Sequence, residues 1–521
     1  MTPAPAYRAS VLIAAALLLF SACAGTGDLA PVGDDEFKTR VAEVFVAGFG
    51  GVADKYIEPV AVHSIAIDGM RGLASIDPAL TVARDEGRVV LFASGREVAR
   101  RPAPNDGDVV GWANVAADIS LAARGASSDL RSANVEALYE AVFDGVLSRL
   151  DIFSRYAGAV EARKNRAKRE GFGGIGIRYQ IEDGVPVIND VLAGTPAAAA
   201  GLRKGDRIVA VDGAALKGLA RNEVSDKLRG PIHSSVELTI DRPGKAQLMV
   251  IGMERGHIFG VTVTASHKDG ILYLKVGSFN QDTARALADE IEKGRAALGD
   301  GMKGVILDLR GNPGGLLKQS VKVADLLLTQ GQIISTRGRH ADSIHYYEAG
   351  GRDLAFGMPV IVLVDGKSAS AAEIVAVALQ DRERAVVIGT SSFGKGSVQT
   401  VIRLPNDGEI TLTWSRLYAP SGYLLHGLGV LPAICTSGVK EDARSAIRAR
   451  MAQRAKTEEA LNAWRLSAAF DDAKRGKLRE SCPSQRRQDD LEIEMARQLL
   501  GDQALYAEAL RLSAATHQAH Y

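Results

Sequence analysis

Short apolar runs, each followed by a turn of small residues, mark the middle of the chain. Residues 305–310 and 359–365 are two such runs, and their β-branched composition predicts strands that are buried on both faces. The first run opens into the glycine-rich stretch 311–315, and the second into the small-residue stretch 366–372. Apolar residues at helical spacing follow each turn. The order strand, tight turn, helix is therefore predicted twice.

Further helices are predicted where apolar residues recur at helical spacing, or where a charged run has one solvated face. These stretches are 34–53, 138–156, 161–170, 221–228, 280–298 and much of 439–521. A short helix is also predicted after Gly194, with Thr195 as its N-cap and Pro196 at its first position.

Strands are predicted where apolar and polar residues alternate between turn residues. They comprise two or three short strands within 80–106, a hairpin over 257–276 with its turn at Asp269-Gly270, and strands at 333–337, 385–389 and 410–418. Residues 338–357 are predicted to form a polar loop. The role of the segment 80–135 does not follow from its pattern.

Composition says more about possible binding partners than about the fold. The 521 residues are enough for two to four domains, and a formal net charge of +1 gives no reason to expect nucleic acid as a partner. The sequence contains no cluster with metal-ligand spacing and no phosphate-binding loop, so neither a metal nor a cofactor is expected. His340, His345 and His426 are scattered, which gives a histidine-based triad no support beyond their presence.

The first residues are typical of an export signal. Arg8 provides a positive start, and residues 11–20 form an apolar stretch too short to span a membrane comfortably. The stretch ends in Phe20-Ser-Ala-Cys23, which resembles a bacterial lipoprotein box and implies lipidation of Cys23. Ordinary cleavage near residues 22–24 is the alternative. The mature protein is expected in the periplasm, anchored by lipid to the bacterial membrane, and the residue after Cys23 favours the outer one.

The cysteine count agrees with export. If Cys23 is lipidated, Cys435 and Cys482 remain and can pair in an oxidising compartment. Two buried free thiols are the alternative, since the sequence does not fix the distance between them.

A serine and a lysine provide candidate chemistry. Ser370 is predicted at a helix N-terminus, where backbone N–H groups can stabilise an oxyanion, and Lys395 follows in the turn 392–397, flanked by glycines. A lysine can deprotonate a serine if desolvation lowers its pKa. Ser368 is a competing nucleophile that chemistry alone does not exclude. Taken singly, a serine here is more often an N-cap, and a loop lysine is more often solvated.

Several motifs in this region resemble those of the carboxyl-terminal processing (tail-specific) proteases, which are serine peptidases with a Ser/Lys dyad and an embedded PDZ domain. They are Ser368-Ala-Ser-Ala-Ala-Glu373, Gln380-Asp381, Phe393-Gly-Lys-Gly396 and Gln399. The resemblance implies that Ser370 is the nucleophile, that Lys395 is the general base and that Gln399 helps to orient the lysine. One departure is Ala372, where the family often has a third serine.

The turn at 311–315 carries a second resemblance. The stretch Asp308-Leu-Arg-Gly-Asn-Pro-Gly-Gly315 is similar to the family's Asp-Leu-Arg-x-Asn-x-Gly-Gly turn. The resemblance implies that the N–H of Gly314 or Gly315, together with that of Ala371, forms the oxyanion hole. Such a turn on its own is more often a plain connection between a strand and a helix.

Residues 171–253 resemble a PDZ domain. Phe172-Gly-Gly-Ile-Gly-Ile177 is similar to the loop and strand that bind a peptide carboxylate, which assigns peptide binding to Gly174, Ile175, Gly176 and Ile177. Physically, successive N–H groups in a glycine turn form an anion-binding nest, and an open strand edge beside it accepts a peptide as an added strand.

The expected fold is α+β and multidomain. Its expected parts are a signal peptide (1–23), a helical N-terminal region with short strands (34–160), a PDZ domain (171–255), a crotonase/ClpP-like αβ protease core (257–435) and a helical C-terminal extension (436–521). The expected function is that of a periplasmic serine endopeptidase acting at or near protein C-termini. Its partners would be protein or peptide substrates bound by the PDZ domain, with an adaptor lipoprotein as a further candidate. The alternatives are a catalytically silent PDZ scaffold and a fold-related acyl-CoA enzyme.

Overall fold

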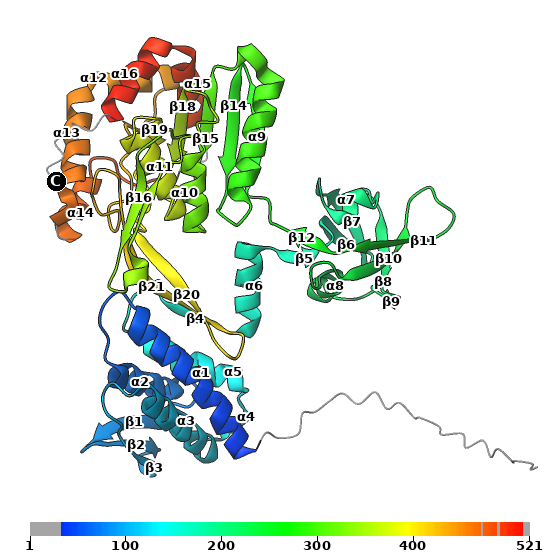
Figure 1. The fold of residues 1–521 in the computed structure, drawn as a ribbon, viewed down its shortest axis with the longest axis vertical. Coiled ribbons are helices and arrows are strands. Elements are labelled where there is room, and N and C mark those ends of the chain that lie inside the picture. The colour runs from blue at the N-terminus through cyan, green and yellow to red at the C-terminus, as the bar shows by residue number, and fades with distance from the viewer. Residues whose placement is uncertain (1–32, 470–471, 487–489, 514–521) are drawn as a thin grey trace, which may run out of the picture.

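The computed structural model describes residues 33–469, 472–486 and 490–513. A helical region from the first part of the chain lies at one end, the core with the C-terminal helices lies at the other, and a small domain projects to the side between them (Figure 1). The predicted export signal at 1–23, with Cys23, lies outside the described residues. Within these ranges, no helix is long and apolar enough to cross a membrane.

A six-stranded sheet in the order β13-β14-β15-β18-β19-β22 organises the core. β13 and β14 form an antiparallel hairpin, and the strands from β14 to β22 run parallel. Every residue of β15 and β18 is buried, as the apolar runs predicted. The strands are β13 (Val263–Lys268), β14 (Ile271–Val276), β15 (Gly304–Asp308), β18 (Val360–Val364), β19 (Val386–Gly389) and β22 (Ile434–Cys435).

Alternate side chains of β18 face two different hydrophobic layers. Val360, Val362 and Val364 pack with α9, α10 and α11 on one face, and Ile361 and Leu363 pack with α12, α15 and α16 on the other. The helices are α9 (Thr283–Leu298), α10 (Leu317–Asp325), α11 (Ala371–Asp381), α12 (Ala443–Ala452), α15 (Leu491–Gly501) and α16 (Gln503–Ser513). The helical C-terminal extension therefore forms the second layer of the core.

A second sheet, β17-β16-β21-β20, extends from the core toward the N-terminal region, where β4 pairs with β21 (Figure 1). Its strands are β4 (Arg155–Ala157), β16 (Gln332–Arg337), β17 (His345–Glu348), β20 (Ser397–Arg403) and β21 (Glu409–Tyr418). The prediction of a plain loop over 338–357 was wrong, because β17 lies within it. β17 is an edge strand with exposed residues on both faces, so no apolar period reveals it.

In the N-terminal region, helices pack around an aromatic core. The ring centroids of Phe45, Phe49 and Phe143 lie within 6.4 Å of one another. Three strands form a separate antiparallel sheet within the segment 80–106, in agreement with the alternation there. The elements are α1 (Asp34–Lys55), α2 (Val62–Arg71), β1 (Leu80–Asp85), β2 (Arg88–Ala93), β3 (Arg96–Pro102), α3 (Val109–Ala126), α4 (Ser128–Ser132), α5 (Val135–Leu147) and α6 (Ala159–Glu170).

The helix predicted over 138–156 ends earlier, at Leu147. The Asp151 carboxylate accepts hydrogen bonds from the N–H groups of Phe153 and Ser154 at 2.7 and 3.0 Å, which closes a turn before β4. The chain thus enters the second sheet as a strand instead of continuing the helix.

The side domain contains a sheet in the order β11-β10-β8-β7-β6, with β9 beside β8 and the helices α7 and α8. β5 and β12, the segments by which the chain enters and leaves the domain, pair with each other. The elements are β5 (Phe172–Gly174), β6 (Ile177–Glu182), β7 (Val185–Val191), α7 (Pro196–Ala199), β8 (Arg207–Val211), β9 (Ala214–Ala215), α8 (Arg221–Leu228), β10 (Ser235–Asp241), β11 (Met249–Glu254) and β12 (Gly256–Ile258).

Two local predictions need correction, one within this domain and one where the chain leaves it for the core. The hairpin predicted over 257–276 begins only at Val263, because residues 256–258 pair with β5 instead. Thr195 precedes α7 as predicted, but its hydroxyl donates to the carbonyl of Leu192 at 2.6 Å and does not cap the helix.

A disulfide joins Cys435, at the end of β22, to Cys482 in the C-terminal extension. The two Cα atoms lie 5.9 Å apart, and the pair spans 47 positions in sequence. The loop so closed contains α12, α13 (Arg454–Arg465) and α14 (Asp472–Arg479). The disulfide therefore ties the helices that follow the core to its last strand.

We expect reduction of this disulfide to lower the free energy of unfolding by about 4 kcal/mol, from the loop-entropy estimate for a loop of this length. Denaturant unfolding with and without a reductant measures the change, and a Cys435→Ala/Cys482→Ala double variant, insensitive to reductant, is the control. Two alkylatable thiols at these positions in the non-reduced protein would contradict the pairing.

Candidate active site

Ser370 lies where β18 has ended and α11 begins. Its backbone has φ 55° and ψ −114°, a conformation that costs a residue with a Cβ about 1–3 kcal/mol and is often found at functional sites. The turn after β15 packs directly against it, since a Cβ added to Gly314 would lie 2.9 Å from the Cβ of Ser370. The two turns predicted from the sequence therefore meet at this point.

The surroundings of Ser368 and Ser370 distinguish the two candidate serines. Ser368 is fully buried, and its hydroxyl donates to the carbonyl of Leu309 and accepts from the N–H of Asp365, both at 2.9 Å. Ser370 is half-buried, and within the described ranges its hydroxyl makes no hydrogen bond, including no helix cap. Ser368 thus holds the turn together, and the hydroxyl of Ser370 is available for chemistry.

Glu373 performs the capping that a serine hydroxyl would usually perform. Its Oε2 accepts from the N–H groups of Ser370 and Lys395 at 2.6 and 3.0 Å. Its Oε1 accepts from the Ser392 hydroxyl at 2.5 Å and from the N–H of Gly394 at 2.7 Å. Burial raises the pKa of this carboxyl, although all four hydrogen bonds favour the anion. One carboxylate therefore fixes the backbone at Ser370 and at Lys395.

The residues 392–396, called the lysine turn below, lie against the segment 425–430, called the strap. Gly427 donates its N–H to the carbonyl of Gly394 at 3.0 Å. A Cβ added to Gly396 would lie 2.0 Å from the backbone nitrogen of His426, so only glycine fits there. Glycines on both sides of Lys395 thus allow the strap to approach closely.

The side chain of Lys395 extends toward the N-terminal region. Its Nζ lies 4.9 Å from the centre of the Phe153 ring, which comes from the turn before β4. Burial lowers the pKa of the Lys395 ammonium, and the nearby guanidinium of Arg155 acts in the same direction. The carboxylates of Glu373 and Asp151 act in the opposite direction without reversing the shift.

The structure brings Ser370 and Lys395 together through Glu373, not through a direct contact. No hydrogen bond between their side chains occurs in the described part of the chain. Gln399 lies on β20 and donates to the hydroxyls of Ser397 and Thr413, at 2.9 and 3.3 Å, and among the described residues it makes no hydrogen bond to the lysine amine. Its orienting role stays a prediction.

The backbone N–H groups proposed for the oxyanion hole are not equivalent. The N–H of Gly314 donates to the side-chain oxygen of Asn312 at 2.8 Å. The N–H groups of Gly315 and Ala371 have no hydrogen-bond partner among the described residues. The N–H groups of Gly315 and Ala371 are therefore available to donate to a ligand, and their role as an oxyanion hole stays a prediction.

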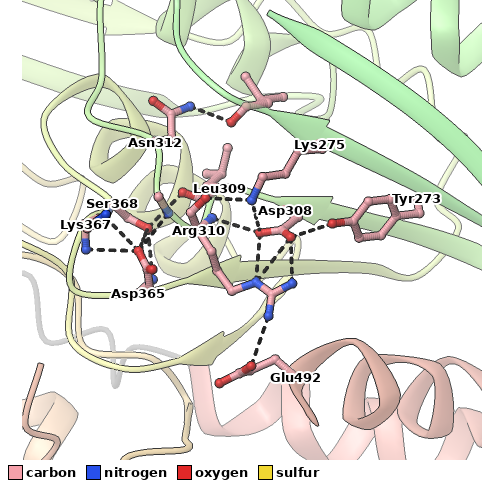
Figure 2. Close-up of polar contacts among 12 residues, drawn as sticks. Tyr273, Lys275, Asp308, Leu309, Arg310, Asn312, Asp365, Lys367, Ser368 and Glu492 are labelled. Atoms are coloured by element: carbon pink, nitrogen blue, oxygen red, sulfur yellow. Dashed lines mark hydrogen bonds and ion pairs between the residues drawn. The ribbon is translucent and has the colours of Figure 1, made fainter. Parts of the chain in front are cut away.

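A polar network holds the start of the Gly311–Gly315 turn in place (Figure 2). Asp308 accepts from the Tyr273 hydroxyl at 2.6 Å and from Arg310 at 2.8 Å, and Lys275 lies 3.1 Å from it. Arg310 also pairs at 3.1 Å with Glu492, on α15 of the C-terminal extension. The network thus connects the turn to the second helical layer. No group of three or more His, Cys, Asp or Glu side chains in the described ranges could hold a metal ion.

The predicted peptide-binding loop of the side domain begins where β5 ends. Gly174 is paired with Gly256 in the β5–β12 ladder, and Ile177 begins β6, which is one of the two edge strands of its sheet. Between them, the N–H groups of Ile175 and Gly176 have no hydrogen-bond partner within the described ranges. Two unpartnered N–H groups and an open strand edge therefore lie side by side, and binding of a peptide carboxylate there stays a prediction.

Two family models match separate parts of the chain. A family model described as peptidase family S41 matches residues 270–436, and one described as a PDZ domain matches residues 187–242. A carboxy-terminal-processing protease of Bartonella bacilliformis is 41% identical over 299 residues, which cover 57% of this chain and 69% of the relative. The chain therefore belongs to peptidase family S41, the serine peptidases that include the carboxy-terminal-processing proteases.

Other similarities are more partial. A probable CtpA-like serine protease of Staphylococcus aureus is 32% identical over 305 residues, and the match covers 58% of this chain and 60% of that protein. Among solved structures, a photosystem II D1 C-terminal processing protease is 27% identical, with a TM-score of 0.34, over 60% of this chain and 87% of that one.

We expect Glu373→Gln to remove most of the activity and to lower the free energy of unfolding by about 3 kcal/mol or more. An amide has one acceptor oxygen, and its NH₂ would face backbone donors, so at least two hydrogen bonds to a charged group would be lost. Hydrolysis of an unfolded protein and denaturant unfolding measure the two effects. Glu383→Gln, just beyond the other end of α11, is the matched control, and equal effects of the two substitutions would contradict the role of Glu373.

Proposed function

We propose that this protein is a periplasmic endopeptidase that cleaves proteins at or near their C-termini, with Ser370 as nucleophile and Lys395 as general base. The observation that carries the proposal is the Glu373 carboxylate, which binds the backbone N–H of both residues and leaves the Ser370 hydroxyl unbonded. Membership of the family supports the reaction class. The strained backbone conformation of Ser370 supports its assignment as the nucleophile.

The reaction would follow the usual course of acyl transfer. The neutral amine of Lys395 takes the hydroxyl proton of Ser370, whose oxygen attacks the scissile carbonyl. The N–H groups of Gly315 and Ala371 stabilise the oxyanion. The C–N bond then breaks, the leaving amine takes the proton, and water hydrolyses the acyl-enzyme. The Lys395 amine must come within hydrogen-bond distance of the Ser370 hydroxyl for the first step.

Substrate capture is proposed for the side domain. A C-terminal carboxylate would bind the N–H groups of Ile175 and Gly176, and the residues before it would pair with the open edge of β6. β5 and β12, the segments by which the chain enters and leaves this domain, pair with each other. The domain that would bind the peptide is therefore linked to the core through a two-stranded ribbon.

The location in the periplasm is part of the proposal. The disulfide between Cys435 and Cys482 supports an oxidising compartment. Lipidation of Cys23 and an adaptor lipoprotein remain proposals that rest on the sequence alone, and metabolic labelling with a radioactive fatty acid would test the first.

We expect Ser370→Ala and Lys395→Ala each to abolish cleavage and to leave the fold intact. Ser368→Ala removes two hydrogen bonds of a buried hydroxyl, so it should lower stability by about 1–3 kcal/mol and retain activity per folded molecule. Cleavage of an unfolded substrate, followed by mass spectrometry of the products, gives the comparison. Wild-type rates from Lys395→Ala, or complete inactivity of folded Ser368→Ala, would contradict the assignment.

We expect the single-turnover rate to rise with pH along one ionisation and then level off. Only the neutral amine accepts a proton, and burial lowers the pKa of Lys395, so the rising limb lies below the ordinary lysine value. A histidine base would place the limb near about pH 6.5. Arg155→Gln should move the limb to higher pH, because it removes a cation that disfavours the protonated lysine. A histidine-like limb abolished by replacing His340, His345 or His426 would exclude lysine as the base.

A further inference from the structure

The C-terminal extension contacts the back of the lysine turn, although the matched family model ends at residue 436. α14 ends at Arg479, whose guanidinium donates through Nη2 to the carbonyl of Ser392 at 2.8 Å and through Nη1 to the carbonyl of Leu428. Ser392 is the first residue of the lysine turn, and Leu428 belongs to the strap. One planar side chain therefore joins the two backbone segments that enclose Lys395.

The strap depends on the extension at a second point. Trp464, at the end of α13, is fully buried and donates its indole N–H to the carbonyl of Gly429 at 3.2 Å. A Cβ added to Gly429 would lie 2.9 Å from Oε1 of Glu373, so the strap packs directly against the buried carboxylate. Any movement of the strap would therefore displace the Glu373 carboxylate, which fixes the backbone at Ser370 and Lys395.

Arg479 also brings a positive charge close to Glu373. A Cβ added to Gly394 would lie 3.3 Å from Nη1 of Arg479, and the N–H of Gly394 donates to Glu373. Burial lowers the pKa of the guanidinium, and the Glu373 carboxylate acts against that shift. No ion pair of Glu373 occurs in the described ranges, so Arg479 acts on it across the turn.

We propose that Arg479 is a positioning residue for Lys395, and that the C-terminal extension is thereby a working part of the active site. By holding the carbonyls of Ser392 and Leu428 together, its two parallel donors keep the lysine turn against Glu373. A lysine would offer a single charged point in place of the rigid fork. The inference rests on the proposed roles of Ser370 and Lys395.

The test compares Arg479→Ala and Arg479→Gln in the full chain with Lys477→Ala, which removes an exposed cation from the same helix. We expect kcat for an unfolded protein substrate to fall about tenfold or more in the Arg479 variants, since small displacements of a catalytic group have effects of this size. KM should change much less, because the substrate-binding domain is untouched. Millimolar guanidinium should restore part of the kcat of Arg479→Ala and none in Ser370→Ala.

An unchanged kcat in folded Arg479→Ala, or a loss that guanidinium does not relieve, would overturn the inference. If circular dichroism shows that Arg479→Ala does not fold, the same change in kcat is measured in folded Arg479→Gln. A wild-type kcat in that variant would equally overturn the inference. Activity in the wild type and in Lys477→Ala is the internal check. Its absence from both would show that the proposed peptidase function itself has failed.

Discussion

The buried carboxylate of Glu373 is the interaction on which the candidate site depends. Removing a carboxylate from water costs several kcal/mol, and this cost is offset only when its oxygens are fully hydrogen-bonded. Four donors meet that condition here, namely the N–H of Ser370 and three groups of the lysine turn. Because the donors belong to two turns that are far apart in sequence, the anion is stabilised only when both turns are in place. The site and the local fold therefore form together.

The second hydrophobic layer explains why such a core requires the C-terminal extension. The odd-numbered apolar residues of β18 would face water if α12, α15 and α16 were absent, and the same helices bring Glu492 to Arg310. The disulfide at Cys482 lies three residues after Arg479, so it restrains the segment that contacts the lysine turn. The extension thus serves the sheet through apolar contacts and the site through polar ones.

Local pattern was sufficient for most elements and for placing Ser368, Ser370 and Lys395 in turns after buried strands, whereas the choice of Ser370 over Ser368 came from the family resemblance. Buried strands are recognisable as short runs of β-branched apolar residues, and the turns are recognisable from their glycines. Glu373 had a signal as well, because Ser370-x-x-Glu373 is the spacing of a capping box. That motif predicts contact with Ser370, but nothing local predicts contact with Lys395. β17, the pairing of β5 with β12, and Arg479 lacked any local signal, since each depends on partners distant in sequence or on an exposed edge.

A lysine that acts as a base and a buried carboxylate that lies close to it require opposite electrostatic environments. The four hydrogen bonds favour the anion of Glu373 although burial raises its pKa, and an anion near Lys395 favours the protonated amine that cannot act as a base. The geometry limits this conflict, because both oxygens of Glu373 face backbone N–H groups and the Ser392 hydroxyl, and the amine extends toward Phe153 and Arg155. Burial and the cation at Arg155 then outweigh the carboxylates, so the pKa of Lys395 is lowered. The carboxyl group can therefore organise the turn while the pKa of Lys395 stays lowered.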